Sequence, residues 1–177
     1  MAFITPDGSY YEGPGPVAVG STEVPVRPSA LHEWTGSAWE IPLARAKLVK
    51  AAELKEACRA ANQDGFYSTA IDGVTQYYYS TDNSFGDSHF DGIDMLFLGS
   101  AYSKALANRD VPGWVIGYPC KSPSDLSLKE YNHTAAQMIQ AGDDGFAFIK
   151  TNRQRLRLRL LQAAAASTVA EVQAIVW

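Results

Sequence analysis

The chain of 177 residues has few of the side chains that bind metals or form disulfides. It contains two cysteines, Cys58 and Cys120, and three histidines, His32, His89 and His133. The two cysteines are too far apart in sequence to have the spacing of a metal-binding pair. Two cysteines are also too few for a disulfide framework. No two histidines have the spacing of a helical zinc site. We therefore expect no metal, no cofactor and synthesis in a reducing compartment.

Charge is also scarce, and long apolar runs are missing. Charged residues make up 19% of the chain, the net charge is -4, and hydrophobic residues reach 46%. A disordered chain is less apolar than this, and a nucleic-acid-binding protein usually carries a basic excess. No apolar run approaches the roughly 18 residues that cross a bilayer. Residues 1–20 lack the pattern of a signal peptide. The composition indicates a folded protein without nucleic-acid binding or membrane insertion.

Familiar catalytic motifs are absent as well. The chain has no Gly-x-Ser-x-Gly, no P-loop and no dinucleotide fingerprint. Asp87, His89 and Asp91 match the first positions of a calcium loop, but Leu98 stands where that loop needs a bidentate glutamate. Acidic residues at the start of a helix, where the macrodipole favours them, explain the cluster better. A hydrolase that uses Asp87, His89 or Asp91 is the enzymatic alternative, but we expect no enzyme.

Three other groups allow a chemical interpretation beside a structural one. Glu130-x-x-His133 has the spacing of a di-iron ligand pair, but the chain holds no second pair. Asp143 and Asp144 are either a paired-carboxylate site or a solvated patch at a helix irregularity. The third group is a basic run: Arg153, Arg155, Arg157 and Arg159. A spacing of two spreads these side chains around a helix. We interpret them as partners of acidic groups, in this chain or another, rather than as a phosphate site.

Residues 1–42 predict a small β appendage. This stretch holds six of the nine prolines, and proline prevents a long helix. Pro6-Asp7-Gly8 indicates a turn, and residues 34–39 predict a hairpin with Gly36 in its turn. The appendage has few long aliphatic residues. We therefore expect its stability to depend on a partner or on the neighbouring domain.

Residues 43–177 predict an α+β domain that is mainly helical. An apolar stripe at intervals of three and four predicts a helix over residues 44–62. The stripe consists of Ala44, Leu48, Ala51, Leu54, Cys58 and Ala61. Residues 66–71 and 74–79 flank Asp72-Gly73, which predicts a β-hairpin with a type I′ turn. A second helix is expected from residues 80–82 to about residue 108, followed by a strand over residues 111–118 that joins the hairpin.

The last third of the chain predicts one long helix. Ser127-x-x-Glu130 has the form of a capping box, which places the start of the helix at Leu128. The stripe of its buried face includes Met138, Gly142, Phe146, Ile149, Arg153, Leu156, Leu160 and Ala163. This phase continues through the glycines and favours an unbroken helix, while a break at residues 142–145 is the alternative. A second capping box, at residues 168–171, opens a short terminal helix.

Aromatic residues are the candidate binding residues: Trp34, Trp39, Tyr77, Tyr78 and Tyr79. The two tryptophans either stack on sugars or form the core of the appendage, and we favour the core because the appendage has little else to bury. Three consecutive tyrosines cannot all face one side of a strand. At least one of them is therefore expected at the surface, where a tyrosine makes a good binding contact.

Several local features follow one another along the chain in an order that is informative. A Lys/Ala/Glu-rich helix leads into Gly65-Phe66 and the Asp72-Gly73 hairpin, and residues 164–177 run from alanines through Thr-Val-Ala-Glu-Val to Ile-Val-Trp. This order resembles a domain of unknown function that recurs in bacteriophage tail and tail-fibre proteins. Residues 23–28 and 34–39 are similar to parts of tail-fibre assembly proteins. The resemblance covers nearly the whole chain and brings no catalytic residue with it.

The resemblance implies a phage tail protein that acts by protein–protein contact. The protein is then either a structural component of the tail fibre or a chaperone-like assembly factor. Its expected partners are tail or tail-fibre proteins, its expected location is the virion tail after synthesis in the host cytoplasm, and a homo-oligomer is expected. The alternative is a receptor-binding module for host attachment that contacts a glycan or a pilus through exposed aromatic residues.

Overall fold

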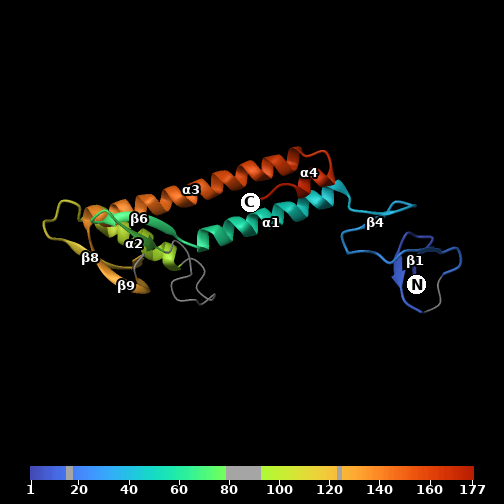
Figure 1. Cartoon of the computed structure of the whole chain (residues 1–177), viewed down its shortest axis with the longest axis horizontal. Coiled ribbons are helices and arrows are strands. Elements are labelled where there is room, and N and C mark those ends of the chain that lie inside the picture. The colour runs from blue at the N-terminus through green and yellow to red at the C-terminus, as the bar shows by residue number, and fades with distance from the viewer. Residues whose placement is uncertain (15–17, 79–92, 123–124) are drawn as a thin grey trace. The chain divides into compact units, whose positions relative to one another are not determined.

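The computed structural model describes residues 1–14, 18–78, 93–122 and 125–177 (Figure 1). Its helices and strands give a mixed α+β class, as predicted. The chain forms two compact units. Unit 1 contains residues 1–50 and 163–175, and unit 2 contains residues 51–162 and 176–177.

Unit 1 contains the short strands that the proline-rich sequence predicts. They are β1 (Ala2–Ile4), β2 (Tyr10–Glu12), β3 (Thr22–Val24), β4 (Glu33–Trp34) and β5 (Trp39–Glu40). The first three form an antiparallel sheet of order β2-β1-β3, and β4 pairs with β5. Gly36 has a φ of 101° between β4 and β5, which confirms the predicted hairpin. Ala2 and Val24 are buried against each other's strands.

Helix α1 (Leu43–Gln63) begins directly after Pro42. Leu54 and Cys58 are buried, as the predicted stripe requires. Leu48, also assigned to that stripe, is 73% exposed, and Ala46 is buried in its place. The stripe is therefore wrong in the first turns of the helix. Gly65 ends this segment with a φ of 85°, and a Cβ at this position would collide with the carbonyl oxygen of Tyr78.

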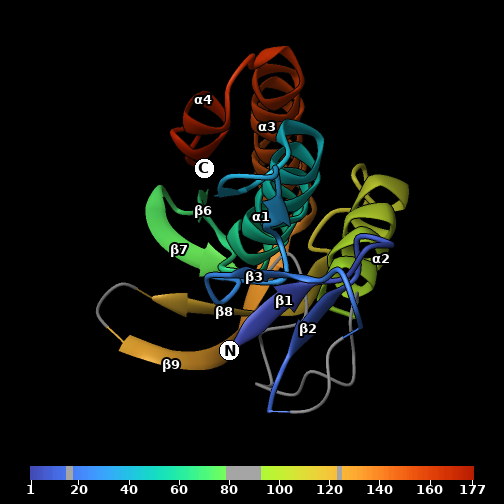
Figure 2. The same cartoon turned by 90° about the vertical axis from the view of Figure 1, so that its right-hand side faces the viewer.

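The sheet of unit 2 starts with the predicted hairpin (Figure 2). Strands β6 (Phe66–Ile71) and β7 (Val74–Tyr78) are joined by Asp72 and Gly73, whose φ values of 50° and 74° fit the predicted type I′ turn. Strand β8 (Val115–Ser122) joins the hairpin as predicted, but it begins four residues later than expected. On its other side it pairs with β9 (Asp125–Thr134). The order is β6-β7-β8-β9, and the described pairings are antiparallel.

Strand β9 replaces the beginning of the predicted long helix. Residues 127–130 do not cap a helix, because this segment pairs with β8 in the register Pro119↔Glu130 and Tyr118↔Tyr131. Helix α3 (Ala135–Ala165) starts seven residues later than Leu128. Its real capping box is Thr134-x-x-Gln137, in which each residue's backbone N–H donates to the other's side chain at 2.8 and 3.3 Å.

Helix α3 is unbroken over 31 residues, which confirms the prediction that it continues through both glycines. The glycines permit close packing. A Cβ on Gly142 would collide with the Tyr102 ring, and a Cβ on Gly145 would lie 2.8 Å from Cζ of Phe66. Met138, Ile149 and Ala163 are buried as predicted. Phe146 and Arg153 are exposed, so their assignment to the buried stripe is wrong.

Two shorter helices complete the described chain. Helix α2 (Ile93–Ala107) packs on the sheet, and the predicted start at residues 80–82 lies outside the described residues. Helix α4 (Val169–Gln173) begins with the predicted capping box of Thr168 and Glu171. The core of unit 2 lies between the sheet, α2 and α3. Its buried side chains include Phe66, Tyr78, Leu98, Cys120 and Met138.

Candidate functional site

The two candidate tryptophans form an aromatic cluster in unit 1. Trp34 and Trp39 pack edge to face with ring centroids 5.3 Å apart, and Tyr10 packs on Trp39 at 5.4 Å. The indole N–H of Trp39 donates to the carbonyl oxygen of Pro25 at 2.7 Å. The Arg27 guanidinium lies 4.6 Å from the centre of the Tyr10 ring, a cation–π arrangement. Both tryptophans are half-buried, so they combine the core role with a partly accessible surface.

A hollow of about 460 Å³ lies beside this cluster. Its lining includes the three aromatic rings together with Arg27, Glu33 and Arg45. Glu33 and Arg45 form an ion pair at 3.3 Å. Aromatic rings beside charged and polar groups suit a sugar or a short peptide better than a purely apolar ligand.

The three candidate tyrosines of the hairpin have different positions. Tyr77 is half-buried on the outer face of β7, where it packs edge to face on Tyr67 at 5.0 Å. Tyr67 is 68% exposed and was not among the predicted binding residues, although alternation along β6 places it on the same face. Tyr78 is fully buried, so it is not a surface binding residue and that prediction is wrong. Tyr79 lies outside the described residues.

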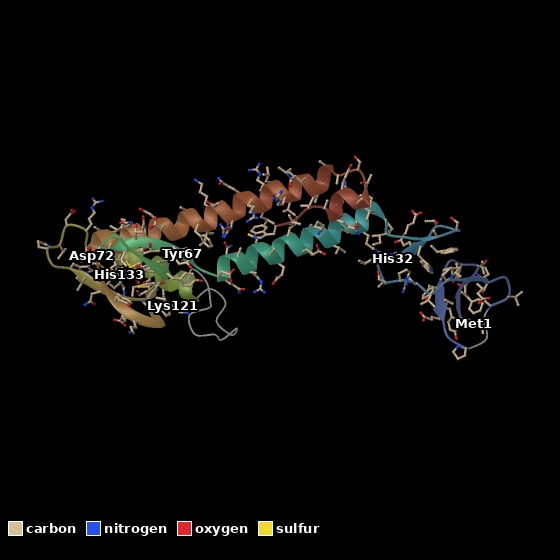
Figure 3. The ribbon with its side chains drawn as sticks, viewed as in Figure 1. Met1, His32, Tyr67, Asp72, Lys121 and His133 are labelled. Carbon is tan, nitrogen blue, oxygen red and sulfur yellow. The ribbon has the colours of Figure 1, made fainter. Side chains whose placement is uncertain are left out.

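Tyr78 belongs to a buried polar network in the core. Its hydroxyl lies 2.8 Å from Nε2 of His133, and Nδ1 of His133 lies 2.8 Å from the carbonyl oxygen of Tyr131. A carbonyl oxygen only accepts, so Nδ1 carries the proton and Nε2 accepts from the tyrosine. His133 lies among the side chains of the sheet region (Figure 3). Tyr78 and His133 are 0% exposed, which makes them structural groups that a substrate does not reach.

Burial controls the protonation of this network. It lowers the pKa of His133, and the imidazole is therefore neutral in the fold. Burial also raises the pKa of the Cys120 thiol to about 11 and raises the pKa of Tyr78. A thiol with a raised pKa is a poor nucleophile because the thiolate is the reactive form. Cys58 is buried too, and desolvation raises its pKa.

The predicted metal candidates are not assembled into a site within the described residues. Those residues contain no group of three or more His, Cys, Asp or Glu side chains that could hold an ion. The calcium-like residues 87–91 lie outside the described ranges. Glu130 and His133 stand on a strand, where an odd separation places their side chains on opposite faces. Glu130 is exposed while His133 is buried, so the helical di-iron spacing does not apply.

Asp143 and Asp144 do not form a carboxylate pair, and the helix is regular where they stand. Oδ2 of Asp144 accepts a hydrogen bond from the Ser68 hydroxyl at 2.6 Å, which ties α3 to β6. Oδ1 of Asp143 accepts from the Tyr102 hydroxyl at 3.0 Å, which ties α3 to α2. The predicted helix irregularity is therefore wrong, and both carboxylates bind neighbouring elements, although Asp143 is exposed to solvent.

The four arginines of α3 divide into two groups. Arg155 lies over the Trp177 ring at 4.9 Å, and Arg159 donates to Oε1 of Gln162 at 3.0 Å. Arg153 and Arg157, together with Lys150, line a hollow of about 350 Å³. Within the described part of the chain, these three cations form no ion pair. The predicted pairing with acidic groups of this chain is thus not found there for Arg153 and Arg157.

Comparison with known proteins gives no relative. No protein-family model matches the sequence, and no curated protein or solved structure is significantly similar to it. None of the described helices is long and apolar enough to cross a membrane. A functional proposal for this chain therefore depends on its own sequence and its own exposed surfaces.

Proposed function

We propose that the chain is a bacteriophage tail protein that acts by protein–protein contact. It serves either as a structural component of the tail fibre or as an assembly factor for the fibre, and it works in the virion tail or on the path to it. A β appendage before a mainly helical domain fits this role, since each part offers a separate contact surface. No bond-making chemistry is assigned to it.

The observation that carries the proposal is the exposure of large apolar side chains on three helices. Leu48 on α1 is 73% exposed, Leu96 on α2 is 71% exposed, and Leu158 on α3 is 58% exposed. Single exposed leucines are ordinary, but exposed leucines on successive helices of a charge-poor chain indicate surfaces that another protein covers. The sequence resemblance to tail and tail-fibre proteins supports the same role.

A deletion of the encoding gene in the phage tests this function. We expect normal heads, with particles that lack fibres or tails or carry defective ones, when negative-stain images and the protein content of purified particles are compared with wild type. Detection of the chain in wild-type particles by mass spectrometry indicates a structural component, and its absence from them indicates an assembly factor. Deletion particles with normal tails, normal fibres and normal infectivity would contradict both roles.

The hollow beside the aromatic cluster of unit 1 favours receptor binding as a second candidate function. Trp34, Trp39 and Tyr10 line it together with Arg27, an arrangement that suits a host glycan. The test is adsorption by particles that carry Trp34→Ala, with Tyr67→Ala on the hairpin as a second variant. Reduced adsorption with intact fibres supports the function. Unchanged adsorption by both variants removes it.

A further inference from the structure

The solvent side of α3 carries a second, uncharged stripe. Ala147, Thr151, Gln154, Leu158 and Leu161 are separated by four, three, four and three residues, and all five are exposed. At 100° per residue these positions share one face of the helix, and their spacing is that of a coiled-coil seam. Leu158 and Leu161 are each 58% exposed. This face therefore has the form of a helix-docking seam.

The stripe lies opposite the face that α3 buries in its own fold. Met138, Ile149 and Asn152 belong to the buried side, about half a turn around the helix from Leu158. A surface helix usually carries one apolar face and one charged face. Here the face turned to solvent holds leucines, a glutamine, a threonine and an alanine. The packing of α3 within this chain therefore does not explain why leucines stand on its exposed face.

Cations border the stripe on both sides. Lys150 and Arg157, seven residues apart, follow one border, and Arg155 stands on the other. Residues 146–165 contain five cations and no acidic residue. Lys150 and Arg157 have no ion-pair partner among the residues that the structure describes. Unpaired charges beside an apolar seam select a partner of opposite charge.

We propose that the solvent face of α3 docks an amphipathic helix of another protein, whose apolar stripe is bordered by glutamate and aspartate. The proposal rests on the proposed function of protein–protein contact and names the surface and the chemistry of the partner. The partner helix lies along Leu158 and Leu161, and the carboxylates of the partner face Lys150, Arg155 and Arg157. The hollow formed by Phe146, Ile149 and Arg153 beside the stripe accepts an apolar side chain of the partner.

Other occupants fit the same face less well. If α3 of a second copy docked there, arginines and lysines would face each other in the parallel and in the antiparallel arrangement, which is destabilising. Within the described part of the chain, helices α1 and α2 carry basic residues, and α4 has only five residues, so none of them is a matching acidic partner helix. A nucleic acid would place its phosphates on the cations but would leave the central leucines without a base-stacking or apolar partner.

Two synthetic helices of about three heptads test the proposal on the full-length protein. Both carry leucine at the seam positions, one with glutamate and the other with lysine at the bordering positions. Fluorescence anisotropy should show that the glutamate helix binds at least about tenfold more tightly than the lysine helix, because the borders of α3 are cationic. The Lys150→Glu/Arg157→Glu variant should reverse that preference.

Two leucine variants locate the contact. Leu158→Gln/Leu161→Gln should weaken binding of the glutamate helix by at least about tenfold, because it removes the apolar centre of the seam. Leu96→Gln, an exposed leucine on α2, should leave binding unchanged. Circular dichroism melts check that each variant keeps its fold, which the exposure of all three leucines favours.

Three results would overturn the proposal. The first is equal binding of both helices, or binding that the double leucine variant does not weaken. The second is tighter binding of a single-stranded oligonucleotide that is insensitive to the leucine changes. The third is self-association in sedimentation velocity that the same variant abolishes, which would make a second copy the occupant. Phage with the double variant separate this failure from failure of the proposed function, because normal fibre assembly there refutes only the seam.

Discussion

At the residue scale, two glycines of α3 set how closely that helix approaches its neighbours. Gly142 and Gly145 stand on the buried face, where the Tyr102 and Phe66 rings occupy the space that a side chain would need. Glycine in a helix is destabilising by about 1 kcal/mol relative to alanine. The close packing of α2 and β6 on α3 offsets this cost. Helix propensity alone therefore predicts that alanine at Gly142 or Gly145 stabilises the protein, whereas the close packing predicts that it destabilises it.

Gly142→Ala should lower the free energy of unfolding by about 1–3 kcal/mol, because the added methyl group forces the Tyr102 ring away from α3. Gly99→Ala is the matched control, since Gly99 is also helical but has nothing within 4 Å of a built Cβ. That control should raise stability by about 0.5–1 kcal/mol. Urea unfolding of both variants measures the difference. An equal gain for both would refute the close packing of Gly142.

Stability should fall in mild acid because of His133. Its pKa is lowered in the fold from the ordinary value of 6.5, so the unfolded chain binds more protons than the folded one below that pH. The stabilising contribution is complete above about pH 6.5 and decreases as the pH falls, by at most about 1.4 kcal/mol per pH unit. Unfolding experiments from pH 8 to pH 5 measure this slope.

The His133→Gln variant should show a shallower slope over this range, and it should be less stable at pH 8 because the contacts to Tyr78 and Tyr131 change. His32→Gln is the control, since His32 is half-exposed in unit 1 and bonded to Ser29. An unchanged slope in His133→Gln would show that another group causes the acid sensitivity.

At the scale of elements, local sequence signals were reliable where one signal stood alone. Asp72-Gly73 between two β-rich runs identified the hairpin, and the spacing of Leu54 and Cys58 identified α1. The segment after Ser122 carries two competing capping boxes, Ser127-x-x-Glu130 and Thr134-x-x-Gln137. Pairing with β8 decides between them. Tyr131 is half-buried between the exposed Glu130 and Asn132, which is the alternation of burial that a strand requires. That pairing is a long-range contact, which a local motif does not contain.

The candidate binding residues also divide into those set by local sequence and those set by long-range contacts. Sequence alone located the aromatic cluster of Trp34 and Trp39, because its hairpin is local. It did not separate Tyr77 from Tyr78, because the inner face of the sheet is defined by α2 and α3. It also missed the seam of α3. Leu158 and Leu161 have the spacing of a core stripe as well as of a surface stripe, and only the position of the buried face distinguishes the two.

The capping box of α4 provides a test at this scale. Glu171 N–H donates to Oγ1 of Thr168 at 3.1 Å, and Thr168 N–H donates to the Glu171 carboxylate at 3.2 Å. Thr168→Ala should cost about 1 kcal/mol in stability. Ser167→Ala is the neighbouring control, because only its backbone N–H contacts Glu171. Equal melting temperatures for the two variants would show that the cap does not stabilise the fold.

At the scale of the whole molecule, the described residues separate reactive side chains from exposed apolar ones. Its histidine, tyrosine and cysteine network lies in the core, and its exposed leucines and cations lie on helices. We propose that another chain, in a phage tail or its assembly intermediate, covers these exposed leucines and cations.

Cross-linking with an amine-reactive reagent in infected cells tests that claim most directly. Lys150 borders the seam of α3, so mass spectrometry should find it linked to a lysine of a tail or tail-fibre protein. The yield of this cross-link should fall strongly in phage that carry Leu158→Gln/Leu161→Gln, while the amount of the chain in the cells stays normal. Recovery of the chain without a cross-link to any tail or tail-fibre protein, at any stage of infection, would contradict the account.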